Sequence, residues 1–173
     1  FRRVLFRSNE MFSRISIDNW LPDNFYAGRS ADYIQGIFGA SYKFAIMMSL
    51  VVQAFRMAAE PFFFSHAEKK DSPIVFARVN HLFTVTAAFF LLAITLNLPV
   101  LQYFIAPEYR EGLGIVPLLL LGYLFLGVYY NMTVWFKVTD KTGYGTLITS
   151  GGAVLTIGLN YLLIPVTGIM GSA

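Results

Sequence analysis

The chain contains no cysteine and few charged residues. Cysteine is absent from all 173 residues, which excludes a disulfide framework and a thiolate metal site. Charged residues make up 13% of the chain, about half of the roughly 25% found in soluble domains. A soluble fold of this composition would lack the polar side chains that its surface needs. The two shortages exclude a disulfide-stapled domain and argue against a soluble globular protein.

Apolar and aromatic side chains are correspondingly abundant. Hydrophobic residues make up 56% and aromatic residues 17% of the chain, and the mean hydropathy is +0.58. Within lipid every backbone polar group must be satisfied inside the protein, so a long apolar stretch is expected to form a helix of about 20 residues. The composition therefore predicts an all-α, multi-pass transmembrane helical bundle.

Four apolar stretches are long enough to cross a bilayer as helices. They cover residues 33–64, 80–104, 114–136 and 145–166. Residues 9–17 resemble the end of an earlier helix, and the last residues of the chain resemble the approach to a further one. We therefore expect four full spans with partial helices at both ends.

The connections between these stretches predict their orientation. Short connections make successive spans antiparallel, so alternate connections lie on the same side of the membrane. The connections at 65–79 and 137–144 carry five lysines and arginines, whereas the other side carries two, Arg29 and Arg110. Because cytoplasmic loops are enriched in lysine and arginine, the connections at 65–79 and 137–144 are predicted to be cytoplasmic.

The first predicted span contains three charged residues, Lys43, Arg56 and Glu60. A charge within a span costs about 2.5–3.5 kcal/mol on insertion scales, so such residues usually face a bundle interior or an aqueous cavity. At about 100° per residue, the polar residues gather on one helix face. They are Tyr42, Ser49, Gln53, Arg56 and Glu60. Lys43 lies about 140° away from this polar face, where it could reach the membrane interface.

Two interpretations of the polar face are open. It could line a water-filled translocation path, in which Arg56 meets an anionic head group, because a planar guanidinium matches phosphate oxygens. Alternatively, it packs against neighbouring helices, with Arg56 and Glu60 satisfying each other as an i,i+4 pair. Pro61 removes a helical donor and predicts a kink or break near the cytoplasmic end.

Other polar residues within the spans leave similar alternatives. Asn97, Asn131 and Asn160 could line the same path, but buried amides also hydrogen-bond between membrane helices, and the second interpretation is favoured for each.

No sequence motif supports an enzyme, a metal site or a cofactor. Residues 140–143 spell DKTG, which resembles the phosphorylated-aspartate signature of P-type ATPases, but they lie between two spans without a soluble nucleotide domain. A turn is predicted there. His66 and His81 have no further ligands near them in the sequence, so no metal site is expected. Nothing indicates covalent or hydrolytic chemistry or nucleic-acid binding.

Two long stretches carry a resemblance to a known family. They are GIFGASYKFAIMMSLVVQAFRMAAEPFFFSHAEKKD at 36–71 and YYNMTVWFKVTDKTGYGTLITSGGAVLTIGLNYLLIPVTGIMGSA at 129–173. The chain from residue 9 onward resembles the Wzx-type polysaccharide and lipid-linked oligosaccharide flippases of the multidrug/oligosaccharidyl-lipid/polysaccharide exporter superfamily. The aromatic-Asn, DKT and LN..LIP elements stand as they do in that family.

The resemblance implies a function and a set of partners. Family members have two six-helix bundles around a central cavity, so residues 9–173 would be a truncated second bundle that lacks its N-terminal partner bundle. The implied activity is translocation of an undecaprenyl-pyrophosphate-linked oligosaccharide for surface polysaccharide or O-antigen synthesis, by alternating access in the bacterial inner membrane. Arg56 would receive the pyrophosphate, with Lys43 secondary. This fragment is not expected to transport alone.

Two further hypotheses remain. The chain could belong to a cation-coupled multidrug exporter of the same superfamily, in which Glu60 would matter more than Arg56. It could also be a non-transporting scaffold of a glycan-assembly complex, in which the polar face of the first span is a contact between helices.

Residues 1–8, FRRVLFRS, are expected to be foreign to the protein. The DNA string TTCAGACGTGTGCTCTTCCGATCT, a common sequencing-library adapter, encodes this octapeptide, and the family resemblance begins after it. Its three arginines are therefore excluded from arguments about charge. Without them the formal net charge falls from +3 to zero.

Overall fold

The computed structural model describes residues 15–17, 19–22, 29–67 and 71–172. These residues contain helices and no strand. The elements after residue 30 are α2 (Ala31–His66), α3 (Ser72–Leu96), α4 (Leu98–Leu101), η1 (Gln102–Phe104), η2 (Pro107–Ile115), α5 (Val116–Val138), α6 (Thr142–Thr167) and η3 (Gly168–Ser172). Of the helix end predicted at 9–17, residues 15–17 are helical, and 9–14 lie outside the described residues, as does the octapeptide 1–8.

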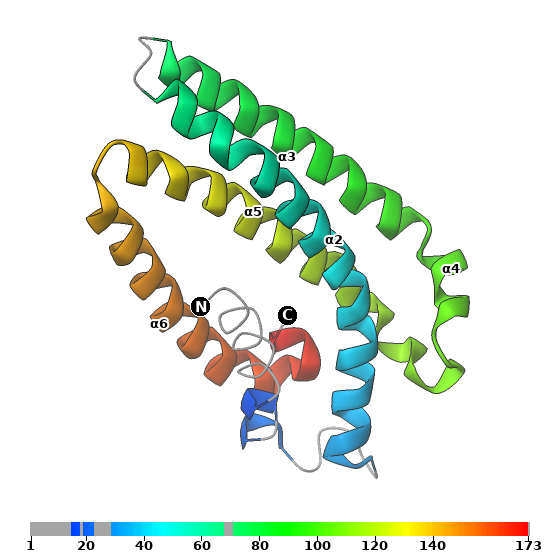
Figure 1. The fold of residues 1–173 in the computed structure, drawn as a ribbon. Coiled ribbons are helices and arrows are strands. Elements are labelled where there is room, and N and C mark those ends of the chain that lie inside the picture. The colour runs from blue at the N-terminus through cyan, green and yellow to red at the C-terminus, as the bar shows by residue number, and fades with distance from the viewer. Residues whose placement is uncertain (1–14, 18, 23–28, 68–70, 173) are drawn as a thin grey trace.

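The predicted all-α, multi-pass helical class is confirmed. Four helical segments are long and apolar enough to cross a membrane: Asp32–His66, Ser72–Leu96, Pro107–Val138 and Thr142–Gly171. The chain runs up and down through them, and Figure 1 shows the C-terminal ends of α2 and α5 at the same end of the bundle. The alternation on which the orientation argument depends is therefore present in the fold.

The second span differs from the predicted range of 80–104. Helix α3 begins at Ser72 and ends at Leu96, so most of the predicted connection at 65–79 is helical and Arg78 lies within α3. The early end has a local cause. Pro99 has no N–H to donate to the carbonyl of Thr95 and its ring crowds that carbonyl, so the chain turns at Asn97 into the short helix α4.

Helix α2 is longer than predicted and continues through Pro61. Its start is fixed by Ser30, whose hydroxyl accepts a hydrogen bond from the backbone N–H of Tyr33, as a helix N-cap does. The helix ends at His66 and includes Pro61, so of the predicted kink or break the break is wrong and the kink stays a prediction. Figure 1 shows α2 changing direction near its middle. There Ser49 donates to the carbonyl of Ile46 at 2.8 Å, a bond within the helix of the kind associated with bending.

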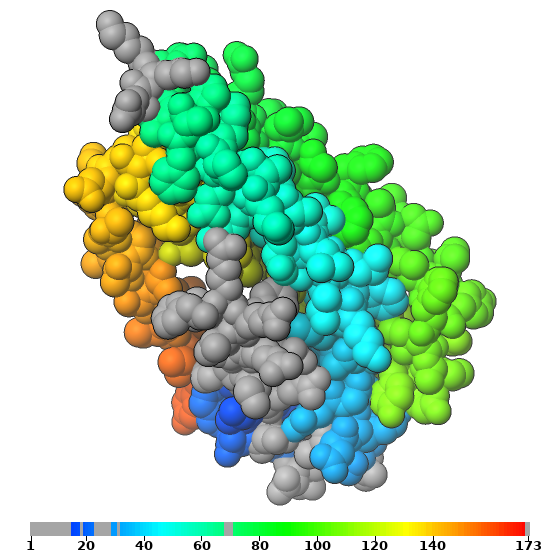
Figure 2. Space-filling model, in the orientation of Figure 1, coloured from blue at the N-terminus to red at the C-terminus, as the bar shows by residue number. Residues whose placement is uncertain are grey.

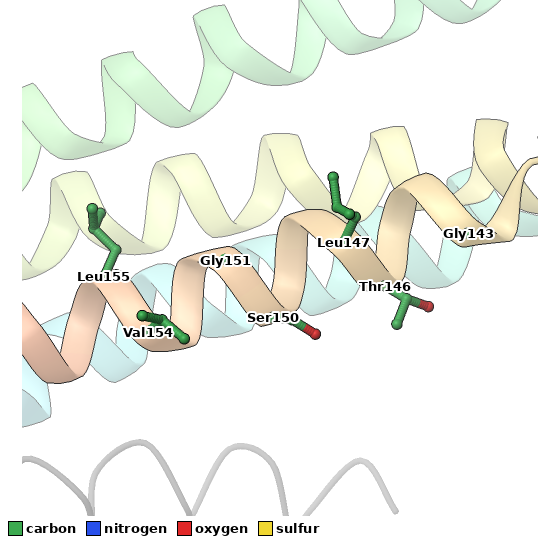
Figure 3. A pocket seen from close by; sticks show the side chains of 7 residues that line it. All are labelled: Gly143, Thr146, Leu147, Ser150, Gly151, Val154 and Leu155. Carbon is green, nitrogen blue, oxygen red and sulfur yellow. The ribbon is translucent and has the colours of Figure 1, made fainter.

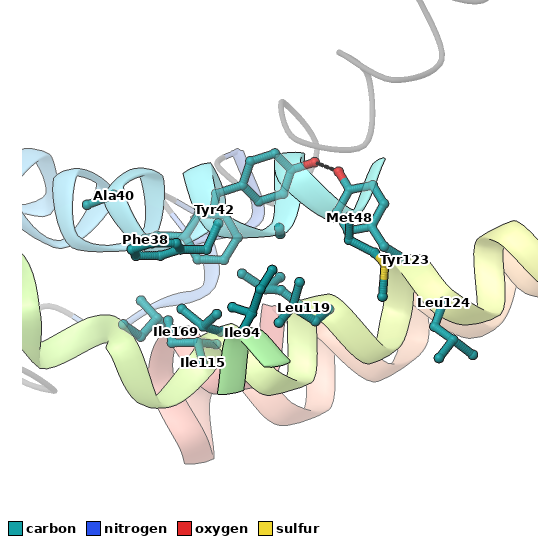
Figure 4. Packing of buried hydrophobic residues seen from close by; sticks show 14 of the residues in the cluster. Phe38, Ala40, Tyr42, Met48, Ile94, Ile115, Leu119, Tyr123, Leu124 and Ile169 are labelled. Atoms are coloured by element: carbon teal, nitrogen blue, oxygen red, sulfur yellow. Dashed lines mark hydrogen bonds between the residues drawn. The ribbon is translucent and has the colours of Figure 1, made fainter. Parts of the chain in front are cut away.

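The core lies where α2 crosses α5. Helix α2 packs chiefly on α5, and α3 packs on both. Buried side chains from the three helices, including Phe38, Met48, Leu119 and Leu120, form one cluster, part of which is drawn in Figure 4. At one edge of the side chains drawn in Figure 4, the hydroxyl groups of Tyr42 on α2 and Tyr123 on α5 hydrogen-bond to each other. The bond satisfies two polar groups that would otherwise be costly to bury.

The end of the bundle opposite the two lysine-bearing connections is also tied together. Arg29 donates to both carboxylate oxygens of Glu111, and the hydroxyl of Tyr33 donates to the carbonyl of Glu108 at 2.8 Å. Both contacts join the start of α2 to η2. Arg110 donates to the carbonyls of residues 102 and 105. The two basic residues predicted for this side, Arg29 and Arg110, are thus engaged in fixing its loops.

Helix α6 lies at the edge of the bundle. It contacts α5, and the following element η3 folds back against the C-terminal part of α6. Figure 2 shows α6 along the edge opposite α3. Gly168 permits this reversal because its φ is 63°, a conformation that costs glycine little. Most of α6 is exposed on the described chain.

Candidate functional site

Arg56 is the centre of a charge cluster that joins α2 to α5. Its Nε lies 3.5 Å from a carboxylate oxygen of Glu60, and the other carboxylate oxygen lies 3.9 Å from Nζ of Lys137. The guanidinium carbon lies 4.6 Å from the centre of the Tyr130 ring, within the range of a cation–π attraction. We call Arg56, Glu60, Tyr130 and Lys137 the charge cluster.

Helical spacing on both elements brings the cluster together. Arg56 and Glu60 stand four residues apart on α2, and Tyr130 and Lys137 stand seven apart on α5, so each pair lies on one helix face. The side chains of Arg56 and Glu60 are 17% and 21% exposed, and that of Lys137 is 46% exposed. The cluster is therefore half-enclosed, with a net charge of one positive unit and its lysine nearest to the surroundings.

The guanidinium of Arg56 keeps unused hydrogen-bonding capacity. Its Nε is buried and has no hydrogen-bond partner among the described residues, although Glu60 lies close enough for an ion pair. A buried donor without a hydrogen bond is costly. An anion able to accept this N–H would gain a bond that Glu60 does not make.

The other residues of the predicted polar face differ in burial. Tyr42 and Ser49 are buried. Tyr42 hydrogen-bonds to Tyr123 on α5, and Ser49 bonds within its own helix. Gln53 and Lys43 are exposed. Tyr42, Ser49, Arg56 and Glu60 thus share the side of α2 that faces the bundle, whereas Gln53 lies at its edge and Lys43 lies apart.

The three asparagines within the spans differ in their surroundings and hydrogen bonds. The side chain of Asn131 on α5 donates to the side-chain oxygen of Asn80 on α3 at 3.2 Å. For Asn131, the interpretation as a hydrogen bond between helices is therefore confirmed. Asn97 instead donates to the carbonyl of Ala93 at 2.7 Å, where it ends α3. Asn160 is buried on α6.

The turn predicted for the DKTG motif is confirmed for its first half. Asp140 and Lys141 lie in the connection between α5 and α6, where Asp140 adopts a φ of 57°, whereas Thr142 and Gly143 begin α6. This left-handed conformation is one that aspartate tolerates better than most residues. Among the described residues, no group of three or more histidines, aspartates and glutamates is placed to hold a metal ion.

A groove between α5 and α6 was not predicted from the sequence. It lies beside Lys137, and its lining contains six residues with hydroxyl groups. The hydroxyl of Tyr129 contacts the backbone oxygen of Gly145 and the hydroxyl of Thr149 across it. The signal that could have found it is the spacing of Thr142, Thr146 and Ser150, which places three hydroxyls on one face of a helix.

Comparisons with known proteins add no family assignment. No family model, curated protein or solved structure matches this chain.

Proposed function

We propose that this chain forms part of a membrane flippase that translocates an undecaprenyl-pyrophosphate-linked oligosaccharide across the bacterial inner membrane by alternating access. The proposal is supported by the resemblance at 36–71 and 129–173. The structural observation that carries it is the state of Arg56. Its guanidinium sits within a helix long enough to span a membrane, paired with a carboxylate and retaining a donor that makes no hydrogen bond.

Glu60 would then act as an internal counter-ion that the substrate replaces. A guanidinium presents a planar fork of donors that matches two oxygens of a phosphate. When a pyrophosphate displaces Glu60 from Arg56, Lys137, which lies 3.9 Å from Glu60 in the structure, is placed to balance the carboxylate. Arg56 and Glu60 each keep an oppositely charged partner in the exchange, which lowers the cost of burying charge.

The position of the cluster along the bundle suits loading from the cytoplasm. Arg56, Glu60 and Lys137 lie toward the C-terminal ends of α2 and α5. Those ends carry the lysine-bearing connections that we propose to be cytoplasmic. A lipid-linked glycan assembled in the cytoplasm would meet this end first.

A scaffold function is the second candidate, because part of the polar face is packed within the bundle. Tyr42 and Ser49 are 5% and 3% exposed, as expected of a contact between helices. A cation-coupled exporter has less support. Its ion site would be Glu60, whose carboxylate oxygens lie 3.5 Å from Arg56 and 3.9 Å from Lys137.

Charge reversal at Arg56 tests the proposal in cells. In bacteria whose surface glycan depends on the protein containing this chain, Arg56→Glu is expected to abolish the glycan, because the site then repels the pyrophosphate. Membrane abundance is measured alongside, and Arg56→Gln, which adds no charge, covers the case in which Arg56→Glu fails to accumulate. Surface glycan is measured by gel electrophoresis of cell extracts.

Gln53→Glu is the matched control, because it introduces the same carboxylate side chain about one turn away at an exposed position. It is expected to leave the glycan at the wild-type level. Normal glycan with both Arg56 variants would refute the assigned role. Loss of drug resistance on Glu60→Gln, with glycan intact, would favour the exporter instead.

A further inference from the structure

The chain turns where α3 ends, and the turn carries apolar side chains on two faces. Residues 98–104 follow the end of α3 as α4 and η1, as Figure 1 shows. One set of side chains packs on the core, namely Leu98, Leu101 and Ile105. The other set is 61%, 74% and 83% exposed and consists of Val100, Tyr103 and Phe104. Their spacing of three and four residues places them on one helix face, which we call the 100–104 face.

Side chains satisfy the backbone carbonyls around this turn. Each helix end leaves carbonyl groups without a partner in the helix. Asn97 and Gln102 donate to the carbonyls of Ala93 and Pro99, each at 2.7 Å. Nε of Arg110 donates to the carbonyls of residues 102 and 105, at 3.0 Å and 3.2 Å. Water would satisfy these carbonyls in an open loop, whereas a backbone beside lipid needs partners within the protein.

Charged residues limit how deep the turn can lie in a membrane. The guanidinium carbon of Arg110 lies 5.3 Å from the centre of the Tyr103 ring, and the ion pair of Arg29 with Glu111 stands on the same element, η2. Charges in the hydrocarbon core are costly, so Tyr103 does not lie deep. Phe104, in contrast, would lose its favourable apolar surroundings in water. The layer that suits both is the membrane–water interface, where tyrosine is enriched.

The long helices show what faces lipid in this chain. The exposed apolar residues of α3 include Val85, Phe89, Leu92 and Leu96. Figure 3 shows Leu147 and Leu155 projecting from one side of α6, and both are more than half exposed. Helix α3 has 25 residues, about 37 Å at 1.5 Å per residue, which exceeds the hydrocarbon thickness of about 30 Å. The 100–104 face therefore continues a lipid-facing surface at the level where the hydrocarbon ends.

We propose that the 100–104 face rests in the headgroup layer of the leaflet opposite the charge cluster. Val100 and Phe104 lie against the headgroup ends of the acyl chains, while the hydroxyl of Tyr103 and the guanidinium of Arg110 stay among phosphates and water. The partner of this face is thus the bilayer itself. The inference uses neither Arg56 nor a substrate, so it does not depend on the proposed function.

This contact also fixes the depth of the charge cluster. The hydroxyl of Tyr33 donates to the carbonyl of Glu108 at 2.8 Å, which holds the start of α2 at the level of η2. Arg56 follows 23 residues later, about 35 Å along the helix. That length exceeds the hydrocarbon core of about 30 Å even at the usual tilt of about 20°. The charge cluster then lies close to the opposite headgroup layer, within reach of a phosphate at its ordinary depth.

Nitroxide labels on single cysteines measure these depths, because the chain has no cysteine of its own. The exposed positions Phe104, Phe89 and Met57 are changed to cysteine one at a time and labelled in phosphatidylcholine vesicles. Paramagnetic resonance then gives the collision rates with oxygen, which concentrates in hydrocarbon, and with a water-soluble nickel complex. The oxygen-to-nickel ratio at 104 and 57 is expected to match that of a lipid labelled at its headgroup. The ratio at 89 is expected to match that of a lipid labelled deep in its acyl chain.

Three results at residue 104 would overturn the proposal. Nickel collisions as frequent as those of a freely hydrated label would place the face in water. A ratio equal to that at 89 would place it in the hydrocarbon, as the hydropathy of 80–104 predicts. A label shielded from both reagents would show that protein covers it. At residue 57, a ratio typical of the acyl chains would overturn the depth assigned to the charge cluster.

Arg110→Gln tests the capping of the carbonyls. It is expected to raise nickel collisions at a label on residue 104, because water must enter to satisfy the carbonyls of residues 102 and 105. Arg78→Gln is the matched control, since Arg78 is an exposed arginine near the other end of α3, and it should leave the ratio at 104 unchanged. An unchanged ratio with Arg110→Gln would refute the role given to Arg110.

Discussion

Replacing Gly127 by alanine is expected to destabilise the bundle, whereas the same change at Gly122 on the same helix is not. A Cβ at Gly127 would lie 2.4 Å from the ring of Phe83 on α3 and 3.0 Å from Val52 on α2. Phe83 is 2% exposed, and its ring centre is 4.7 Å from that of Phe55, so it has no room to retreat. Overpacking of this kind costs about 1–3 kcal/mol.

Gly122 supplies the control because nothing lies within 4 Å of a Cβ built there. Alanine at that position should be neutral or stabilising by up to about 1 kcal/mol, since glycine is the poorer helix former. The free energies of unfolding are compared by titrating detergent-solubilised protein with SDS and following helicity. Equal stability of the Gly127 and Gly122 variants would contradict the described junction of α2, α3 and α5. Adding Phe83→Leu to Gly127→Ala should recover part of the loss.

Removing the carboxylate of Glu60 is the second change with a large expected effect. Glu60→Gln leaves Arg56 and Lys137 without the anion that lies 3.5 Å and 3.9 Å from them. Breaking a fully buried pair costs about 3–5 kcal/mol. Because both partners here are about one-fifth exposed and therefore partly screened by their surroundings, we expect a loss of about 2 kcal/mol in the same SDS titration.

Two further variants show whether that loss comes from unpaired charge. The double variant Arg56→Met with Glu60→Met removes both members and should recover most of the stability, because no charge is stranded. Lys137→Met removes the outer, 46% exposed cation and should cost less than about 1 kcal/mol. A double variant as unstable as the sum of its single changes would show that Arg56 and Glu60 are not coupled.

The sequence predicts the helical class and the approximate positions of the spans because lipid imposes a minimum apolar length on each helix. It misplaces the second span for a physical reason. Hydropathy counts apolar residues and so extends that span to residue 104, but the missing N–H of Pro99 ends the helix at Leu96. At its N-terminal side the predicted connection at 65–79 includes Arg78, which lies within α3, and a charged residue near a helix end can reach the interface.

The candidate site is predictable only in part. Helical periodicity on α2 correctly groups Arg56 with Glu60, because both lie on one helix and the angle between them follows from the spacing. Periodicity cannot identify the helix that faces them, so Tyr130 and Lys137, which lie some 70 residues away in the sequence, were not assigned to the site. The groove between α5 and α6 was missed for the same reason, since it exists only when α5 packs beside α6.

The most direct test of the proposed function is equilibrium binding of undecaprenyl pyrophosphate to the purified chain in nanodiscs made of zwitterionic lipid. Wild type is compared with Arg56→Gln and Glu60→Gln. If Glu60 is a counter-ion that the pyrophosphate displaces, Arg56→Gln should weaken binding about tenfold, the loss of a charged hydrogen bond worth about 1.5 kcal/mol. Glu60→Gln should bind at least as tightly as wild type, because the competitor for Arg56 is gone. Binding that is unchanged by Arg56→Gln, or abolished by Glu60→Gln, would contradict the proposal.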